Sequence, residues 1–426
     1  MMQQSGHETV FTLETTPIKF GPGASDEAGW ELRRLGVTRA LLVSDPGIVR
    51  AGITDRVRHS IEAAGIACVV YDRVRVEPTV QSLQDAADFA RAEKVDGFVG
   101  LGGGSSIDTA KVANLLVKYP APLLEYVNKP IGAARIPPGP LMPLLAMPTT
   151  AGTGSEATSV AALEIPEQHV KTGLSNRWLR PNIGIVDPLL TLTMTPEVTS
   201  SCGLDALCHA VESYLARDFT SRPTPETPGD RPTFQGSTPI SDIWAMKTLE
   251  LGGQYLRRAV QNGQDIEART QMSLAAMIAG IGFGNAGTHI PHACSYPIAG
   301  LKHVYEPPGY PTDHPFVPHG HSVIVTAPAA FRFTYATNPA KHHHAAELLA
   351  GRPLPDADEN TLPTVLIQLM KDIEAPRGIA ELGYDEGDLD ALVEGALKQQ
   401  RLLVISPREP SPDDLAGILR ASMANW

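Results

Sequence analysis

Over the first 190 residues, short runs of consecutive apolar residues alternate with segments in which apolar residues recur every three or four positions. An uninterrupted short run is typical of a strand buried on both faces, and the three-to-four spacing is typical of an amphipathic helix. The runs span 40–44, 67–71, 97–100 and 141–147, and the helical patterns span 54–64, 80–93 and 107–118. This alternation predicts parallel βαβ units.

The pattern changes after residues 186–188. Strand signals fade there, and longer helical patterns follow at 200–216, 239–260, 266–281, 363–375 and 389–402. The chain of 426 residues also exceeds the length of one ordinary domain. We therefore expect an α/β domain with a parallel sheet over residues 1–190 and an all-helical domain over residues 191–426.

A glycine-rich turn follows the apolar run at 97–100. Its sequence from Gly100 to Lys111 is Gly-Leu-Gly-Gly-Gly-Ser-Ser-Ile-Asp-Thr-Ala-Lys. Glycines let a backbone approach a pyrophosphate, and the N-terminus of the following helix offers unpaired N–H groups and a positive dipole end. The spacing differs from the Rossmann fingerprint, because Ser105 holds the third glycine position counted from Gly100. The turn is a candidate nucleotide loop, although a ligand-free strand-to-helix turn has the same pattern.

A second polar turn follows the apolar run at 141–147. Residues 148–156 read Pro-Thr-Thr-Ala-Gly-Thr-Gly-Ser-Glu and offer hydroxyls and backbone amides. Ligands of parallel sheets bind at the carboxyl ends of strands, where both turns are expected to lie. Two such turns favour a nucleotide-dependent enzyme.

Four side chains form a candidate metal site. Asp205 and His209 are four residues apart in an expected helix, so they lie on one face of it. His292 follows a glycine-rich apolar stretch, and His319 lies in Val-Pro-His-Gly-His. One carboxylate and three imidazoles suit a divalent metal with room for a substrate oxygen. A histidine of this kind taken alone is more often an ordinary core or turn residue than a metal ligand, and the two polar turns upstream are what favour the metal.

Composition narrows the possible functions. The net charge is −12 and no basic stripe is visible, which argues against a nucleic acid or an anionic membrane as partner. Apolar runs stop well short of the roughly 18 residues that a membrane helix needs. The opening residues Met-Met-Gln-Gln-Ser-Gly-His-Glu-Thr match neither a secretory signal nor an Arg-rich transit sequence. Four cysteines without a CxxC pair fit a reducing compartment, and we expect a cytoplasmic protein.

The chain resembles the iron-containing (group III) alcohol dehydrogenase family over nearly its whole length. The motifs that carry the resemblance are the two turns, the metal-ligand segments, Lys19-Phe-Gly-Pro-Gly23 and Leu41-Leu-Val-Ser-Asp45. Segments 231–244, 280–289, 295–300 and 313–320 make it most similar to one subgroup, the hydroxyacid–oxoacid transhydrogenases. The resemblance implies a dinucleotide-binding α/β domain joined to a helical metal-binding domain, an architecture shared with dehydroquinate synthase.

The resemblance also implies roles for single residues. Asp45 resembles the carboxylate that binds the adenosine ribose, which favours NAD over NADP because a 2′-phosphate would meet a like charge. Lys171 resembles a lysine close to the cofactor. The pyrophosphate loop corresponds to Gly103, Gly104, Ser105 and Asp108, the hydroxyl cluster to Thr149, Thr150 and Thr153, and the metal ligands to Asp205, His209, His292 and His319. Family resemblance favours Fe(II), and Zn(II) accepts the same ligands.

One position departs from the family pattern. Most members have a second histidine four residues after the ligand that corresponds to His292, and here Tyr296 holds that place. In those members that histidine helps to pass the alcohol proton to solvent, so the resemblance does not carry the ordinary proton relay over to this chain. A transhydrogenase needs such a relay less, because NAD stays bound while one hydroxy acid is oxidised and one oxo acid is reduced. Tyr296 is a candidate proton donor or a space-filling side chain.

The resemblance implies hydride transfer from 4-hydroxybutyrate to 2-oxoglutarate with tightly bound NAD. The alternatives are an NAD-dependent alcohol or aldehyde dehydrogenase with exchangeable cofactor and a lyase of the dehydroquinate-synthase type. Both proposed substrates are carboxylates, so we expect a cation in the cleft. Arg231 and Lys302 are the preferred pair among the candidates, which also include Arg177, Arg180 and Arg332. Small hydroxy and oxo acids are the expected partners, and a homo-oligomer is expected.

Overall fold

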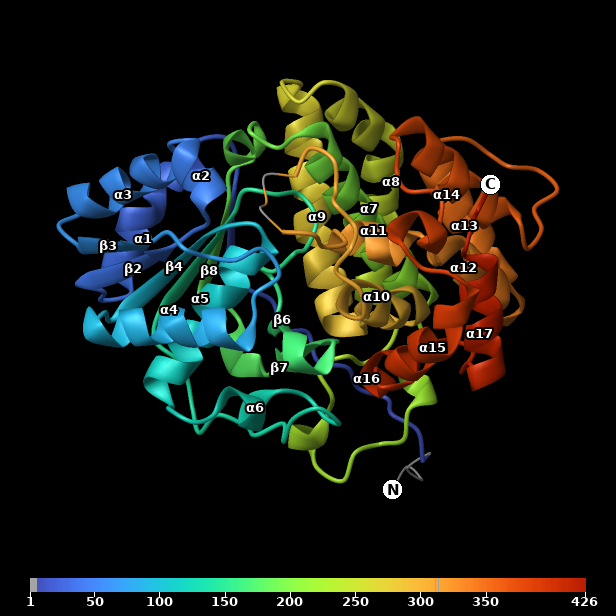
Figure 1. The fold of residues 1–426 in the computed structure, drawn as a ribbon, viewed down its shortest axis with the longest axis horizontal. Helices are drawn as coiled ribbons and strands as arrows, with labels where there is room; N and C mark the ends of the chain where they lie inside the picture. The colour runs from blue at the N-terminus through green and yellow to red at the C-terminus, as the bar shows by residue number, and fades with distance from the viewer. Residues whose placement is uncertain (1–5, 311, 313) are drawn as a thin grey trace.

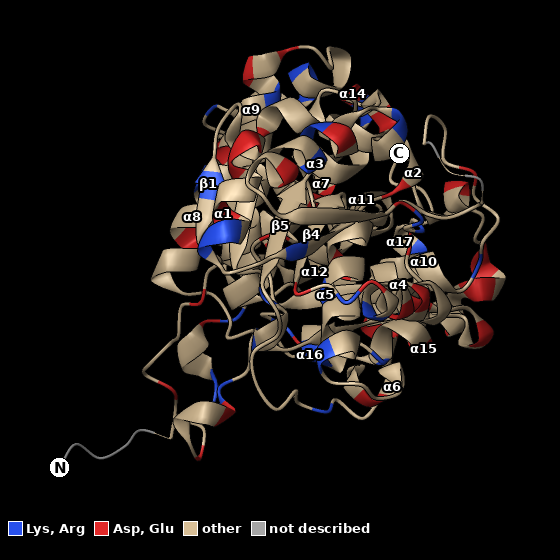
Figure 2. Ribbon diagram, turned by 90° about the vertical axis from the view of Figure 1, so that its left-hand side faces the viewer, with Lys and Arg blue, Asp and Glu red and all other residues tan. Residues whose placement is uncertain are grey.

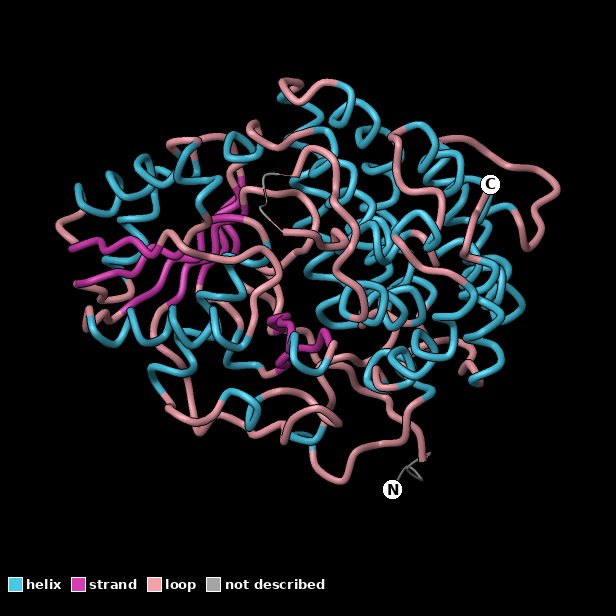
Figure 3. Tube along the Cα trace, viewed as in Figure 1, coloured by secondary structure: helices cyan, strands magenta, loops and turns pink. Residues whose placement is uncertain are grey.

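The protein is described by a computed structural model that covers residues 6–310, 312 and 314–426. Strands occupy one half of the molecule and helices fill the other half, as Figure 3 shows. The predicted fold class, a parallel-sheet α/β unit joined to a helical unit, is confirmed. The strands of the large sheet end at Val186, and the first long helix of the second half begins at Pro196.

The large sheet has six parallel strands in the order β1-β8-β5-β4-β2-β3. Strands β4, β5 and β2 are neighbours or next neighbours, so the residues that follow them meet at one edge of the sheet. The strands are β1 Ile18–Phe20, β2 Arg39–Val43, β3 Ala67–Tyr71, β4 Gly97–Gly102, β5 Leu144–Pro148 and β8 Ile183–Val186.

Helices cover both faces of this sheet (Figure 1). Successive side chains of a strand point to opposite faces, and Leu41 and Leu42 of β2 accordingly belong to different hydrophobic clusters. The cluster of Leu42 is completed by α1 (Ala28–Arg34) and α3 (Ile53–Ala63). The cluster of Leu41 is completed by α4 (Val80–Ala92) and α5 (Gly104–Lys118). Burial on both faces explains why these strands are almost uninterruptedly apolar.

A two-stranded antiparallel hairpin lies beside the sheet and was not predicted from the sequence. Strands β6 (Val160–Ile165) and β7 (Val170–Ser175) pair with each other and with no strand of the large sheet. Figure 3 shows the hairpin between the strand half and the helical half. It packs on helix α10, where a Cβ added to Gly300 would lie 2.8 Å from the amide nitrogen of Lys171. The hairpin therefore joins the two halves.

The helical half is built on three long helices that pack side by side: α7 (Pro196–Leu215), α8 (Pro239–Gln261) and α9 (Ile266–Ala286). These confirm three of the predicted helical segments. The predicted helix 389–402 is instead two short helices separated at Lys398 and Gln399. The remaining helices are α2 Pro46–Arg50, α6 Leu123–Tyr126, α10 Ile290–Gly300, α11 His319–Ile324, α12 Ala327–Thr334, α13 Pro339–Ala350, α14 Thr361–Asp372, α15 Leu389–Leu397, α16 Gln400–Leu403 and α17 Pro412–Ala421.

The segment before β1 packs on the helical half, although the predicted boundary at residue 190 groups it with the sheet. Glu8 forms an ion pair with Arg231 at 2.9 Å. The amide of Glu14 donates a hydrogen bond to Asn285 Oδ1 at 3.0 Å. Residues 8–14 thus cross from one half to the other, and the division at residue 190 stays a prediction for the rest of the chain.

Charged residues of both signs are interspersed over the side of the molecule that Figure 2 shows, and no continuous basic band crosses it in that view. Within the described residues, no helix is both long enough and apolar enough to cross a membrane.

Candidate active site

One cavity of about 470 Å³ is bordered by both halves of the molecule. The candidate cofactor and metal residues of the sequence, and Tyr296, all line it, so the structure brings together residues up to 274 positions apart, from Asp45 to His319. They are Asp45, Gly103, Gly104, Ser105, Asp108, Thr149, Thr150, Thr153, Lys171, Asp205, His209, His292, Tyr296 and His319. Their individual roles stay proposals, and their contacts decide which roles are chemically open to them.

The glycine-rich turn passes from β4 into α5 at the edge of the sheet. Gly102 has φ +148°, a conformation that side-chain-bearing residues rarely adopt, and a Cβ there would lie 2.3 Å from Ser106 Oγ. Gly103 is the N-cap of α5 and provides no capping side chain. The first amides of the helix therefore point into the cavity without intrahelical partners, as an anion-binding helix N-terminus requires.

The second turn packs directly on the first. The amide of Thr149 donates to the carbonyl of Gly102 at 3.0 Å. A Cβ added to Gly104 would lie 2.9 Å from Thr153 Cγ2, so a larger residue there would push the two turns apart. Thr149 Oγ1 is buried and has no hydrogen-bond partner among the described residues. This hydroxyl is open to a ligand.

Asp45 has a structural role besides the one implied by the family. It is the N-cap of α2, and its Oδ1 accepts hydrogen bonds from the amides of Gly47 at 2.8 Å and Ile48 at 3.1 Å. Its Oδ2 lies 3.4 Å from Ser106 Oγ. Because Oδ1 is used by the cap, Oδ2 is the oxygen left to accept a ribose hydroxyl.

Asp108 holds the two turns together through hydrogen bonds on their buried side. Its Oδ1 accepts from Ser155 Oγ at 2.6 Å, and its Oδ2 accepts from the amide of Ala162 at 2.8 Å. Lys111, which is fully buried, donates to Ser155 Oγ at 2.8 Å and lies 3.5 Å from Asp108. With both oxygens engaged, Asp108 ties α5 to the second turn and to β6, and it orients the nucleotide loop indirectly.

Lys171 on β7 forms a buried ion pair that sequence reasoning missed. Its Nζ lies 2.5 Å from Glu77 Oε2, and only 4% of its side chain is exposed. Burial alone would lower the pKa of Lys171, but Glu77 and then Glu164 raise it. Glu77 has φ +57°, and its amide donates to Ser105 Oγ at 3.2 Å. A non-glycine residue at positive φ on a cavity wall is a strained position that the surrounding contacts must hold.

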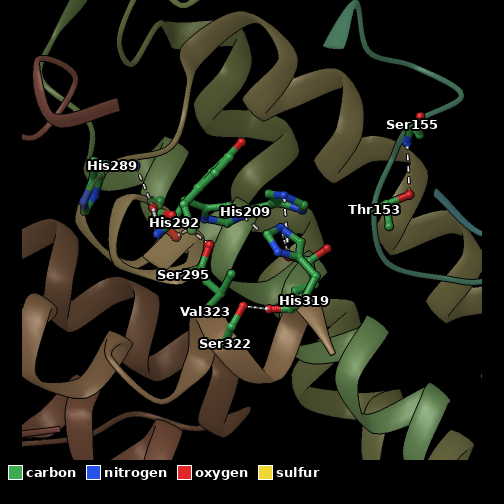
Figure 4. Close-up of polar contacts among 12 residues, drawn as sticks. Thr153, Ser155, His209, His289, His292, Ser295, His319, Ser322 and Val323 are labelled. Atoms are coloured by element: carbon green, nitrogen blue, oxygen red, sulfur yellow. Dashed lines mark hydrogen bonds and ion pairs between the residues drawn. The ribbon is translucent and has the colours of Figure 1, made fainter. Parts of the chain in front are cut away.

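The candidate metal ligands converge on one carboxylate oxygen. Asp205 Oδ1 lies 3.7 Å from His209 Nε2, 3.5 Å from His292 Nε2 and 3.7 Å from His319 Nε2. Asp205, His209 and His292 each offer a ligand atom within 4.8 Å of the other two. Figure 4 shows the imidazoles of His209, His292 and His319 turned towards one another. The rings come from three helices, α7, α10 and α11, so the cluster depends on the tertiary fold.

The cluster fits a cation. Asp205 Oδ1 and His292 Nε2 are buried and have no hydrogen-bond partner among the described residues. Burial lowers the pKa of His209 to about 4 and that of His319 to about 3, so both rings are neutral at pH 7 and offer lone pairs. Burial would raise the pKa of Asp205, but the imidazoles, that of His209 foremost, hold it below its usual range. Unpaired donors of this kind are what a divalent metal needs.

Glu212 is a further residue of this site. Its Oε1 lies 2.5 Å from His292 Nδ1, and its Oε2 accepts the amide of His289 at 2.6 Å. Burial would lower the pKa of His292, yet Glu212 and Asp205 raise it to about 10. The sequence held a signal for it, because Asp205, His209 and Glu212 follow one another at i, i+4 and i+7 on one helix face.

His289 precedes His292 by only three residues, yet its ring does not reach the cluster. It is the N-cap of α10, and its ring stands edge-on to Phe331 with centroids 6.1 Å apart. Neither ring nitrogen has a hydrogen-bond partner among the described residues. Figure 4 shows His289 apart from the three converging imidazoles. His289 contacts the site with its backbone amide, which donates a hydrogen bond to Glu212, and not with its ring.

Tyr296 lies one helical turn after His292 on α10 and borders the same cavity. Its hydroxyl oxygen accepts a hydrogen bond from Arg401 Nη2. A guanidinium has donors only, so the hydrogen of the Tyr296 hydroxyl stays available to an acceptor in the cavity. Arg401 carried no recognisable signal in the sequence, because its neighbours in the chain match no motif.

The two cations preferred from the sequence for a substrate carboxylate are wrong. Arg231 is paired with Glu8, and Lys302 Nζ lies 2.5 Å from Asp388 Oδ2. Neither lines the cavity, and both charges are already neutralised. The other three candidates also lie elsewhere: Arg177 pairs with Glu14, Arg180 donates to the carbonyl of Ala157, and Arg332 donates to Asn360.

A parallel sheet with glycine and threonine turns at its carboxyl edge, facing a buried carboxylate–imidazole cluster, fits a two-part nucleotide-dependent enzyme. The family can be named as well. The model of the iron-containing alcohol dehydrogenases matches residues 15–188, and the model of the C-terminal part of the Fe-containing alcohol dehydrogenase family matches residues 234–423. The chain belongs to the iron-containing alcohol dehydrogenase family, whose members act on alcohol groups.

The chain is similar over nearly its full length to proteins named hydroxyacid-oxoacid transhydrogenase, mitochondrial. The protein from Rattus norvegicus is 43% identical, with 99% of this chain and 92% of the relative covered. The protein from Xenopus tropicalis is also 43% identical, with 98% and 91% covered. Among solved structures, a 1,3-propanediol oxidoreductase superposes with a TM-score of 0.84 at 29% identity and covers 97% of this chain and all of its own.

Proposed function

We propose that this enzyme moves a hydride from 4-hydroxybutyrate to 2-oxoglutarate and keeps NAD bound through both half-reactions. The observation that carries the proposal is the single cavity in which the two nucleotide turns face the Asp205 cluster. The names of relatives that are 43% identical over nearly the whole chain support the choice of hydroxy and oxo acids. The products are succinate semialdehyde and 2-hydroxyglutarate.

The reaction balances without an external oxidant. The alcohol carbon of 4-hydroxybutyrate loses a hydride and its oxygen loses a proton. The keto carbon of 2-oxoglutarate gains a hydride and its oxygen gains a proton. The enzyme therefore has to hold one hydride equivalent and one proton between the two half-reactions. Because the second half-reaction uses the hydride and the proton that the first one releases, neither cofactor release nor proton exchange with solvent is required.

Two groups would be held by residues that fit them. We assign a divalent metal, with Fe(II) favoured and Zn(II) as the other choice, to Asp205, His209, His292 and His319. When bound there, it would polarise the substrate oxygen as a Lewis acid. We assign NAD, the carrier of the hydride, to the amides at Gly103, Gly104 and Ser105, the hydroxyls of Thr149, Thr150 and Thr153, and Asp45 Oδ2.

The chain's own residues position the reactants and handle the proton. Asp108 and Lys111 hold the two turns together from the buried side, so the nucleotide site is preorganised. Lys171, neutralised by Glu77, closes the wall formed by the hairpin. We assign Tyr296, one turn after His292, to carry the proton. As a phenolate, stabilised by the hydrogen bond from Arg401, it would accept the proton of the alcohol, and as the resulting phenol it would donate that proton to the oxygen of the oxo acid.

Purified protein incubated with 4-hydroxybutyrate and 2-oxoglutarate, with no NAD added, tests this function. We expect succinate semialdehyde and 2-hydroxyglutarate in equal amounts. Deuterium placed on carbon 4 of 4-hydroxybutyrate should appear on carbon 2 of 2-hydroxyglutarate, because it travels with the hydride. Strict dependence on added NAD would instead indicate an alcohol dehydrogenase with exchangeable cofactor. A product without any redox change would indicate the lyase alternative.

The compartment and assembly are part of the proposal. We propose a cytoplasmic homo-oligomer that works on small acids. The free state of Cys68, Cys202, Cys208 and Cys294 supports a reducing compartment. The relatives from Rattus norvegicus and Xenopus tropicalis are named as mitochondrial proteins. Cell fractionation decides the compartment, and light scattering of the purified protein decides the assembly.

A further inference from the structure

Among the described residues, three Lys or Arg side chains line the active-site cavity: Arg50, Lys171 and Arg401. The charge of Lys171 is neutralised by Glu77. Arg50 ends helix α2, whose first residue follows Asp45, so it belongs to the end of the cavity assigned to the ribose. Arg401 lies on α16, in the helical half, and no carboxylate of the described chain forms an ion pair with it.

The position of Arg401 is set by Tyr296. Helix α16 packs on α10, and the Arg401 guanidinium lies 5.4 Å from the centroid of the Tyr296 ring. Its Nη2 donates to the Tyr296 hydroxyl. A guanidinium carries five N–H donors in a rigid fork, so most of them remain after this bond. The phenol thus orients a cation that still has its carboxylate-binding edge free.

Arg401 and the metal cluster border one cavity, and Tyr296 connects them. Tyr296 lies on α10 one turn after His292, and Arg401 donates to its hydroxyl. A short acid that contacts the cluster at one end and Arg401 at the other would lie along the Tyr296 side of this cavity. A reacting carbon joined to a carboxylate by two methylenes spans about 4 Å, and a contact at each end adds about 3 Å, for a total of about 10 Å.

The two substrates of the proposed reaction share this spacing. In 4-hydroxybutyrate, two methylenes separate the alcohol carbon from the carboxylate. In 2-oxoglutarate, two methylenes separate the keto carbon from the distal carboxylate. One fixed cation at one distance therefore serves both half-reactions. 2-Oxoglutarate carries a second carboxylate on its reacting carbon, where 4-hydroxybutyrate carries a hydrogen. In the proposed binding mode this carboxylate lies on the side of the metal cluster.

We propose that Arg401, oriented by Tyr296, binds the distal carboxylate of both substrates and so selects hydroxy and oxo acids with two methylenes between the reacting carbon and the carboxylate. This inference rests on the proposed function. The Arg401 guanidinium is then the group that lets the enzyme distinguish these acids from simple alcohols. Phe283 and Leu402 supply apolar wall along the cavity, which suits the two methylenes. Bidentate binding of a carboxylate by arginine supplies both affinity and direction.

Ligand binding without turnover tests the proposal. Butyrate and the uncharged butyramide are titrated into the enzyme as purified, with its cofactor, by calorimetry. We expect Arg401→Gln to weaken butyrate binding about 10-fold to 100-fold, as loss of a charged hydrogen-bond partner does, and to leave butyramide unchanged. Arg401→Lys should recover part of the loss. Tyr296→Phe should weaken butyrate less than Arg401→Gln does, because the cation stays but loses its orienting acceptor.

Lys398→Gln is the matched control, since Lys398 precedes Arg401 by three residues and pairs on the surface with Glu394 at 2.9 Å. It should leave both titrations unchanged. Unchanged butyrate binding in Arg401→Gln, or an equal loss of butyrate and butyramide, would overturn the proposal. If butyrate selectivity depends on Arg401 but the mixture of 4-hydroxybutyrate and 2-oxoglutarate gives no products, the anchor stands and the proposed transhydrogenation fails.

Discussion

Glu212 Oε1 lies 2.5 Å from His292 Nδ1, and this contact determines which nitrogen of the imidazole faces Asp205. Because Glu212 holds Nδ1, only Nε2 is left for the cluster, where it lies 3.5 Å from Asp205 Oδ1. Carboxylates in this position orient an imidazole ligand and increase its basicity. The pair also places a second negative charge behind the cluster, which favours a cation there.

Glu212→Gln should lower metal affinity about 10-fold to 100-fold while the fold is retained, because the amide neither carries charge nor fixes the ring as strongly. Metal content after dialysis against graded chelator measures the change. Glu250→Gln is the control, since Glu250 is exposed and pairs with Lys247 at 2.9 Å, outside the metal cluster. Equal metal retention in both variants would show that Glu212 does not support the site.

Gly104→Ala should lower the amount of NAD that copurifies. The added Cβ would lie 2.9 Å from Thr153 Cγ2, so the two nucleotide turns have to separate. Bound NAD is measured by absorbance after acid release. Gly417→Ala is the control, because nothing lies within 4 Å of a Cβ at that helical glycine. It should keep NAD and gain about 0.5–1 kcal/mol in helix stability.

Lys171→Met should destabilise the fold by about 3–5 kcal/mol, because Glu77 is then left as a buried unpaired charge beside Glu164. Adding Glu77→Gln to the same protein should restore most of this loss, since the isolated charge is removed. Urea unfolding followed by fluorescence gives the apparent free energies of unfolding. The ion pair between Lys247 and Glu250 offers the comparison, because the Lys247 side chain is 48% exposed. Lys247→Met should lower the free energy of unfolding by less than about 1 kcal/mol.

Glu156 should make the fold less stable as the pH rises. Burial raises the pKa of this carboxyl from 4.5 to about 7. Folding therefore favours the protonated form, and the resulting stability is complete below pH 4.5 and is lost as the pH rises through 7. The two pKa values differ by an amount worth about 3 kcal/mol.

Glu156→Gln keeps a neutral side chain at every pH. The variant should lose less stability between pH 5 and pH 8 than the natural chain does, by up to about 3 kcal/mol. Urea unfolding at the two pH values measures both losses. Identical losses in the two proteins would mean that Glu156 is already ionised in the fold at pH 5.

Local patterns determined much of this protein. The apolar runs of β2, β4 and β5 identified the sheet, because a strand that is buried on both faces has almost no polar position. Asp205 and His209 could be paired from their spacing because a helix places residues four apart on one face. Family motifs supplied His292 and His319, which no spacing argument connects to α7.

Only the tertiary structure decided the contacts between distant segments. Arg231 and Lys302 were expected in the cleft, but their partners Glu8 and Asp388 lie 223 and 86 residues away in the chain. Arg401 meets Tyr296 across 105 residues, and Lys171 meets Glu77 through a hairpin that packs on α10. A sequence records each charge but not its partner, because an ion pair between remote residues depends on how whole helices and strands pack. The placement of Asp205 and His209 on one face of a helix was local information, and the shape and charge of the cavity around them were not.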